Sequence, residues 1–100
     1  MKRRQIIYTA DAATDLETIY DTVAEAADTG VASQYNRRLR EFCEGLAYGA
    51  ERGSLRDDIR PHLWVIGFER RISVAFAVEG DRVVILRLFY GGRDWNSALR

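Results

Sequence analysis

Hydrophobic residues recur with a helical period in two segments of the first half of the chain. Between residues 10 and 28 they are spaced three and four positions apart, which predicts an amphipathic helix. The apolar stripe of this helix comprises Leu16, Ile19, Tyr20, Val23, Ala24 and Ala27. The pair Thr29-Gly30 interrupts the pattern, and a second helix follows, with Tyr35, Leu39, Phe42 and Leu46 on one side. Because the connection is short, we expect the two helices to form an antiparallel hairpin.

Strand-like segments lie on both sides of the helices. Residues 4–8 form a short run that ends at Thr9, whose side chain can cap the helix that follows. Residues 49–61 have the composition of a polar connector, and Pro61 favours an extended Arg60 at the start of a sheet. Strand-like runs then cover residues 62–68, 71–78 and 82–90, and the turn Glu79-Gly80-Asp81 joins the last two. These runs predict an antiparallel meander.

The predicted sheet has two different faces. In the run 71–78, the larger side chains that share one face are Ile72, Val74, Phe76 and Val78. The small side chains on the other face, which indicate close cover or a partner, are Ser73, Ala75 and Ala77. The run 82–90 is apolar on both faces except at Arg87, as in a central strand. We therefore predict an α+β fold, with an N-terminal strand and a two-helix hairpin packed on a mainly antiparallel sheet (β-α-α-β-β-β).

Chain length and charge limit the classes of protein to consider. A chain of 100 residues with 47% hydrophobic content is the size of one domain, spanning residues 1–100. The net charge is zero, so no overall field draws the protein to nucleic acid or to an anionic membrane. No apolar run approaches the roughly 18 residues that a membrane helix needs. The single cysteine, Cys43, excludes an internal disulfide, and we expect a soluble protein of the reducing cytoplasm.

Charged residues are unevenly distributed along the chain. The segment 10–30 contains six acids and no base, whereas the second half is rich in arginine. Arginine outnumbers lysine fourteen to one. This ratio is explained either by codon composition or by a need for the planar guanidinium fork, which matches carboxylates and phosphates.

Three motifs follow one another along the chain. Ala13-x-Asp15-Leu16-x-x-Ile19 lies in the first helix, and Arg56-Asp57-Asp58-Ile59-Arg60-Pro61 precedes the sheet. Arg87-x-x-x-Gly91-x-Arg93-Asp94-Trp95 closes the chain. In this order and spacing, over essentially the whole chain, the sequence resembles the ParE branch of the RelE/ParE superfamily of bacterial toxin-antitoxin systems.

The resemblance implies a cytoplasmic toxin that inhibits bacterial growth. It also implies a ParD-like antitoxin whose flexible tail wraps around the toxin, forms a hetero-oligomer with it and neutralises it. ParE-like members are generally taken to inhibit DNA gyrase, while RelE-like members cut messenger RNA on the ribosome. The residues must decide between these two activities.

A RelE-like ribonuclease needs several cationic and tyrosine side chains on one concave face. The candidates for such a catalytic set are Arg71, Arg87, Tyr90 and Arg93. The connector, however, holds Asp57 and Asp58, which would repel a phosphate, and no tyrosine follows Tyr90. The residues therefore favour a protein that acts by binding over an enzyme.

Other catalytic arrangements find little support in the sequence. His62 is the only histidine, so no histidine pair can act as general acid and base, and no metal-ligand spacing occurs. Cys43 lies on the apolar side of the second helix, where a core position explains it better than a nucleophile. Gly91-Gly92 leaves a strand without a following helix, so there is no phosphate loop. We expect no cofactor and no metal site.

Arg87, in an otherwise apolar strand, needs a carboxylate or a partner because an unpaired buried guanidinium is costly. We expect Asp57 or Asp58 to pair with it. The predicted structural polar network comprises Asp57, Asp58, Arg87 and Asp94. It would explain why the polar connector and the closing motif occur together.

Aromatic and arginine residues near the ends of the sheet are candidates for partner binding. They are Trp64, Phe68, Arg70, Arg71, Tyr90, Arg93 and Trp95. The competing interpretation for the aromatic residues is ordinary core. An acidic antitoxin tail would lie along the groove beside the helix hairpin and meet the arginines. The acidic first helix is either a solvated face or a contact for a basic patch on the target.

We therefore interpret the chain as the toxin of a type II toxin-antitoxin pair that binds DNA gyrase without catalysis. The alternatives are a ribosome-dependent messenger RNA endoribonuclease and an inactive toxin that retains antitoxin binding. Direct sequence-specific binding to nucleic acid is not expected, because the chain has no recognition-helix motif and no basic stripe.

Overall fold

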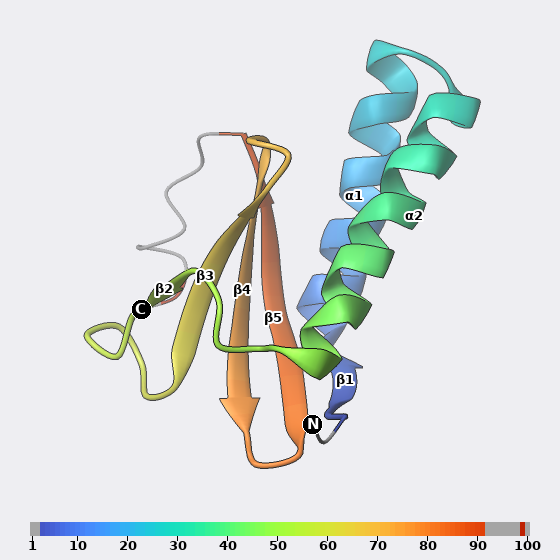
Figure 1. The fold of residues 1–100 in the computed structure, drawn as a ribbon. Coiled ribbons are helices and arrows are strands. Elements are labelled where there is room, and N and C mark those ends of the chain that lie inside the picture. The colour runs from blue at the N-terminus through green and yellow to red at the C-terminus, as the bar shows by residue number, and fades with distance from the viewer. Residues whose placement is uncertain (1–2, 92–98, 100) are drawn as a thin grey trace.

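The computed structural model describes residues 3–91 and Leu99, and its elements form two helices on one sheet (Figure 1). In chain order they are β1 (Gln5–Tyr8), α1 (Ala10–Ala26), α2 (Thr29–Gly45), the 3-10 helix η1 (Leu46–Tyr48), β2 (Ser54–Leu55), β3 (Leu63–Phe68), β4 (Ile72–Glu79) and β5 (Arg82–Tyr90). The strands are ordered β1-β5-β4-β3-β2. β1 runs parallel to β5, and the other neighbouring strands are antiparallel. The predicted α+β class and element order are confirmed, and the short β2 is added from within the connector.

Side-chain caps fix where the helices begin. The Thr9 hydroxyl accepts a hydrogen bond from the Ala12 backbone N–H at 3.0 Å, as the sequence predicted. The Asp28 carboxylate accepts one from the Val31 N–H at 2.8 Å and starts α2. The predicted helix boundary was therefore wrong, since Thr29-Gly30 forms the first turn of α2 instead of the break. Asp28 lies at the positive end of a helix dipole, where its charge is favourable.

The main core lies between the helices and one face of the sheet. Its buried side chains include Leu16, Ile19, Leu39, Leu46, Val74, Phe76 and Ile85. A smaller cluster on the opposite face contains Leu63, Ala75, Phe89 and Leu99. The alternation predicted for β4 is confirmed, because Phe76 belongs to the helix-side cluster and Ala75 to the other one.

A β-bulge interrupts β5. Ala75 pairs with Arg87, but its neighbour Phe76 pairs with Ile85, so Leu86 is an extra residue. Ile85 and Leu88, three positions apart, therefore both belong to the helix-side core. The bulge changes which residues of β5 face the helices from this point to the end of the strand.

The turn between β3 and β4 is tight and has an unusual backbone. Glu69 and Arg70 have φ of 48° and 60°, and the Arg71 N–H donates to the Phe68 carbonyl at 3.1 Å. Two left-handed residues in succession are the pattern of a type I′ turn, which usually contains Asn or Gly. The upper ends of α1 and α2 project past this end of the sheet (Figure 1).

Two glycines test the close packing of the connector on the sheet. Gly53 has φ of 86°, and an added Cβ would lie 2.3 Å from the Val65 carbonyl oxygen. Gly53→Ala is expected to lower the free energy of unfolding by about 3 kcal/mol, from clash and backbone strain. Gly45→Ala is the control, because a Cβ there meets nothing within 4 Å; it should stabilise by about 0.5 kcal/mol. Urea unfolding measures both, and equal effects would contradict the close approach of Gly53 to β3.

Candidate functional site

Arg87 is held by a carboxylate of the first helix. Its Nε donates to Asp15 Oδ2 at 2.8 Å, and its Nη2 donates to Asp15 Oδ1 at 3.2 Å. Asp15 Oδ2 also accepts a hydrogen bond from the Leu88 backbone N–H at 2.9 Å. Asp15 is only 9% exposed. Hydrogen bonding to Asp15 raises the pKa of the Arg87 guanidinium. We call Asp15, Arg87 and the Leu88 N–H the Asp15 clamp.

The prediction that Asp57 or Asp58 pairs with Arg87 was wrong. Asp58 forms a two-point ion pair with Arg56 at 2.9 and 2.8 Å. Asp57 accepts a hydrogen bond from the His62 backbone N–H at 2.9 Å and so supports the left-handed φ of 63° there. Asp57 and Asp58 therefore make contacts within the connector, while Asp15 forms the ion pair with Arg87. Asp94, the fourth member of the predicted network, lies outside the described residues.

The Asp15 clamp lies where β1 ends and β5 continues. The last pair between the two strands joins Tyr8 to Ile85. Beyond it, the Thr9 hydroxyl donates to the Leu86 carbonyl at 2.8 Å, and Asp15 accepts from Leu88. Backbone groups at a sheet edge need partners when they are covered. The start of α1 therefore supplies side-chain partners in place of a longer strand.

The four residues of the possible ribonuclease set do not all meet in the part of the chain that the structure describes. Arg71 Nη1 lies 3.4 Å from the Tyr90 hydroxyl, and Arg71 is exposed. Arg87 is engaged by Asp15 and lies 4.9 Å over the Phe89 ring. Arg93 falls outside the described residues. The structure brings two of the four together and assigns a third to the clamp.

The predicted partner-binding residues also separate. Arg70, Arg71 and Tyr90 share the end of the sheet at the β3–β4 turn. Phe68 is 7% exposed and packs against the rings of Tyr35 and Phe42 at 5.8 and 5.1 Å, so its ring is core. Trp64 lies at the opposite end of β3, in a hollow of about 220 Å³. The residues that line this hollow are Glu51, Leu55, Asp57, His62, Trp64 and Val78. Arg93 and Trp95 are outside the described residues.

Three residues at the β3–β4 end were not singled out in the sequence. Arg38 of α2 forms a two-point ion pair with Glu69 at 2.9 and 3.1 Å and lies 5.3 Å over the Tyr35 ring. The Tyr35 hydroxyl is buried and has no hydrogen-bond partner among the described residues. Only the helical spacing of Tyr35 and Arg38 was visible in sequence, since Glu69 is 31 residues from Arg38. We call Tyr35, Arg38, Glu69, Arg71 and Tyr90 the sheet-end cluster.

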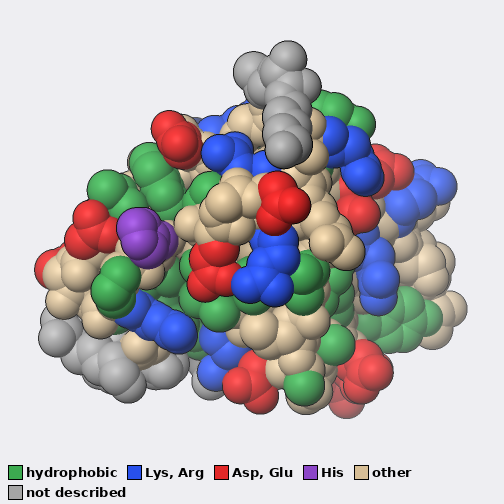
Figure 2. All heavy atoms as spheres, turned by 90° about the horizontal axis from the view of Figure 1, so that it is seen from below, with side chains coloured by type: hydrophobic (Ala, Val, Ile, Leu, Met, Phe, Trp, Pro, Cys, Tyr) green, Lys and Arg blue, Asp and Glu red, His purple; other side chains and the backbone are tan. Residues whose placement is uncertain are grey.

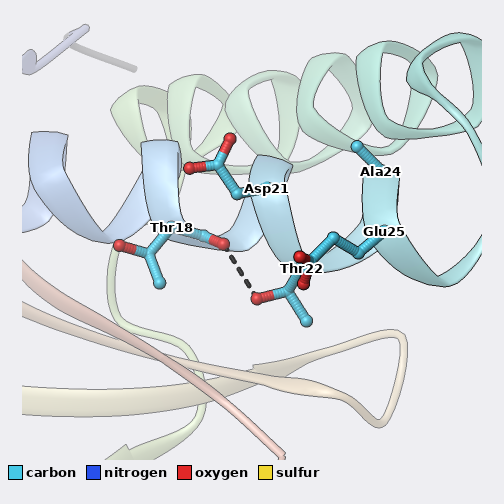
Figure 3. A pocket seen from close by; sticks show the side chains of 5 residues that line it. All are labelled: Thr18, Asp21, Thr22, Ala24 and Glu25. Carbon is cyan, nitrogen blue, oxygen red and sulfur yellow. Dashed lines mark hydrogen bonds between the residues drawn. The ribbon is translucent and has the colours of Figure 1, made fainter.

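A hollow of about 490 Å³ lies along the upper half of α1 (Figure 3). Its lining consists of Thr18, Asp21, Thr22, Ala24 and Glu25. In Figure 3 the side chains of Thr18 and Thr22 point toward the strands. The Thr22 hydroxyl donates to the Thr18 carbonyl at 2.9 Å, within its own helix. This part of α1 thus carries acidic and hydroxyl groups.

Cys43 and the possible metal ligands are the remaining candidates for chemistry in the described part of the chain. Cys43 is buried, and burial raises the pKa of its thiol to about 12, so it is not a nucleophile. No three His, Cys, Asp or Glu side chains between residues 3 and 91 gather as metal ligands.

Neither described helix is long and apolar enough to cross a membrane. Figure 2 shows acidic and basic side chains interspersed on the lower face.

Comparisons with known proteins agree with one another. A family model described as ParE toxin of type II toxin-antitoxin system, parDE, matches residues 6–95. A solved structure of the chromosomal ParDE toxin-antitoxin system from P. aeruginosa contains a similar chain, with 27% sequence identity and a TM-score of 0.76. The match covers 89% of this chain and 97% of that chain. None of the curated proteins matches significantly.

Removal of Asp15 tests how much the Asp15 clamp contributes to the stability of the fold. Asp15→Ala leaves Arg87 and the Leu88 N–H without their acceptor, and it is expected to lower the free energy of unfolding by about 3 kcal/mol. Glu17→Ala, which removes an exposed carboxylate from the same helix, is the control and should change stability by no more than about 0.5 kcal/mol. Chemical unfolding of both variants makes the comparison. Similar losses in the two variants would contradict the clamp.

Proposed function

Because the chain belongs to the ParE toxin family of type II toxin-antitoxin systems, we propose that it inhibits growth by binding DNA gyrase and is neutralised by a ParD antitoxin. Family membership implies the antitoxin partner. The target and the mode of neutralisation are the parts that we propose. The activity is non-catalytic in this proposal.

The observation that carries the proposal is the engagement of Arg87. Both oxygens of Asp15 are taken up by its guanidinium, and Asp15 is nearly fully buried. A guanidinium held in this way is a poor donor for the charge that develops on a phosphate during cleavage. Arg71 and Tyr90 remain as the described members of the set, and each interacts with the other. This arrangement supports binding over RNA cleavage.

The charges around the site also favour a protein target. Net charge is zero, and the α1 hollow contains Asp21 and Glu25. An RNA backbone carries a negative charge on every nucleotide and requires a basic track. A protein surface can match interspersed charges with its own. The acidic side of α1 is therefore a reasonable contact for a basic patch on the target.

Antitoxin binding is proposed along the space between the helix hairpin and the end of the sheet. Arg70, Arg71 and Tyr90 lie at this end of the sheet, and Arg93 and Trp95 are expected to add to the contact. A tail with alternating apolar and acidic residues fits such a surface. Trp64 and its hollow lie at the other end of the sheet, within reach of a chain that wraps around the toxin.

Ribosome-dependent RNA cleavage is the second candidate, and the exposed Arg71 beside Tyr90 is the observation that favours it. An inactive toxin that still binds antitoxin is the third. Both predict that gyrase continues to supercoil DNA in the presence of the protein.

Plasmid supercoiling by purified gyrase with ATP tests the proposal. The protein, refolded free of antitoxin, is expected to inhibit supercoiling in proportion to its concentration, and antitoxin added in equal amount should restore it. A folded sample that binds antitoxin but leaves gyrase unaffected would rule out the proposed activity. Cleavage of messenger RNA on translating ribosomes by the same sample would then establish the second candidate.

A further inference from the structure

The end of the sheet has more hydrogen-bond donors than acceptors. The Arg71 guanidinium carries five N–H groups, and its contact with the Tyr90 hydroxyl is long, at 3.4 Å. Arg71 is exposed, and it takes part in none of the salt bridges between described residues. Most of its donor capacity is therefore turned toward solvent at this end of the molecule.

A buried tyrosine hydroxyl adds another donor. Tyr35 is 7% exposed, and its hydroxyl has no hydrogen-bond partner among the described residues. Burial without a partner costs free energy, which a suitable acceptor would recover. Burial also raises the pKa of this hydroxyl, and Glu69 and Tyr90 act in the same direction, so it remains protonated and able to donate.

The cluster's own acceptor is already in use. Both oxygens of Glu69 accept hydrogen bonds from Arg38, so the charge of Glu69 acts on Arg71 without a hydrogen bond between them among the described residues. The Arg38 and Glu69 side chains are 47% and 41% exposed. Arg38 lies 5.3 Å over the Tyr35 ring, and long exposed side chains can change rotamer at small cost, so a ligand that displaces the Arg38–Glu69 pair would approach Tyr35 from this side.

The backbone holds Arg71 in place from both sides. Its N–H donates to the Phe68 carbonyl at 3.1 Å, and its carbonyl accepts from the Gly91 N–H at 2.7 Å. The turn before it places Glu69 and Arg70 in left-handed conformations, at φ of 48° and 60°, that asparagine or glycine would adopt more easily. The turn thus keeps charged side chains where a neutral turn would be less strained.

We propose that Arg71, Tyr90 and Tyr35 form a receptor for one carboxylate, and that an Asp or Glu side chain of the antitoxin occupies it. This inference rests on the proposed neutralisation by antitoxin. A carboxylate offers acceptors only, so it suits a place that has an arginine fork and two hydroxyl donors. The bound carboxylate would take the N–H groups of Arg71 and the hydroxyl of Tyr35 together.

A peptide carboxylate suits the surroundings better than a nucleic-acid phosphate does. The end of the sheet also carries an acid, because the Glu69 side chain in the turn before Arg71 is 41% exposed. A polyanion laid across this end would approach this acid as well as Arg71. A peptide can place an acid on Arg71 and a basic or hydroxyl side chain beside Glu69. The preferred antitoxin segment therefore carries charges of both signs.

If this receptor exists, removing the Tyr35 hydroxyl should weaken antitoxin binding without lowering the stability of the free toxin. Tyr35→Phe removes a hydroxyl that is unpaired in the free toxin, so the free energy of unfolding should be unchanged or higher. The same change should weaken binding of the purified ParD antitoxin about 5- to 10-fold, and Arg71→Gln should weaken it about 10- to 100-fold. Arg82→Gln, which removes one exposed arginine at the other end of β5, should change affinity by less than about 2-fold.

Isothermal titration calorimetry with full-length toxin measures these affinities, and urea unfolding measures stability. In addition, changing one Asp or Glu of the antitoxin to its amide should weaken binding to the wild-type toxin. The same change should have no further effect on binding to Arg71→Gln, because the two residues form one contact. Wild-type affinity in both Arg71→Gln and Tyr35→Phe would overturn the receptor while leaving neutralisation intact. Unchanged antitoxin affinity in Arg71→Gln, with weaker binding of a single-stranded RNA oligonucleotide, would identify a phosphate site instead. Failure of the wild-type toxin to bind antitoxin would overturn both the receptor and the proposed neutralisation.

Discussion

The two-point contact between Asp15 and Arg87 joins the first helix to β5, the strand next to β1 in the sheet. β1 has four residues and β5 has nine, so the edge of β5 continues beyond its parallel neighbour. An edge of this kind needs cover and partners for its backbone groups. Thr9 and Asp15 supply them from the start of α1, and Arg87 neutralises the carboxylate that burial would otherwise penalise.

The bulge at Leu86 connects this clamp to the candidate site. Val83 and Ile85 face the helices, and an unbroken alternation would continue with Arg87 and Phe89 on that side. The extra residue places Leu88 and Tyr90 there instead, so Tyr90 lies beside Arg71 while Phe89 enters the opposite cluster. The contact between Tyr90 and Arg71 thus depends on the register change at Leu86, and the clamp holds β5 just after it.

Local patterns in the sequence predicted most of the fold. The helical period of Leu16, Ile19 and Leu39 and the alternation around Phe76 are properties of neighbouring residues, and the structure confirms both. The helix boundary at Asp28 was misplaced, because an acid there suits a helix start as well as it fits the preceding acidic stripe. A short run such as Ser54–Leu55 gains its strand character only from pairing with β3.

The site was less predictable, because its contacts join distant parts of the chain. Asp15 and Arg87 are separated by 72 residues, and several acids had the right chemistry to serve Arg87. Choosing among them requires knowing that α1 crosses β5 where β1 ends. The unpaired Tyr35 hydroxyl could not be predicted either, since helical spacing places the ring in the core but does not indicate its hydrogen bonds.

Arg87, in our proposal, maintains the fold and takes no direct part in the activity. The most direct measurement is gyrase inhibition by Arg87→Met, expressed per folded molecule and made below the temperature at which the variant unfolds. We predict a less stable protein whose inhibition per folded molecule stays within about 2-fold of wild type, because binding surfaces remain in place. A loss of about 100-fold or more in a folded variant, the size expected when a hot-spot residue of a binding surface is truncated, would contradict this structural role of Arg87.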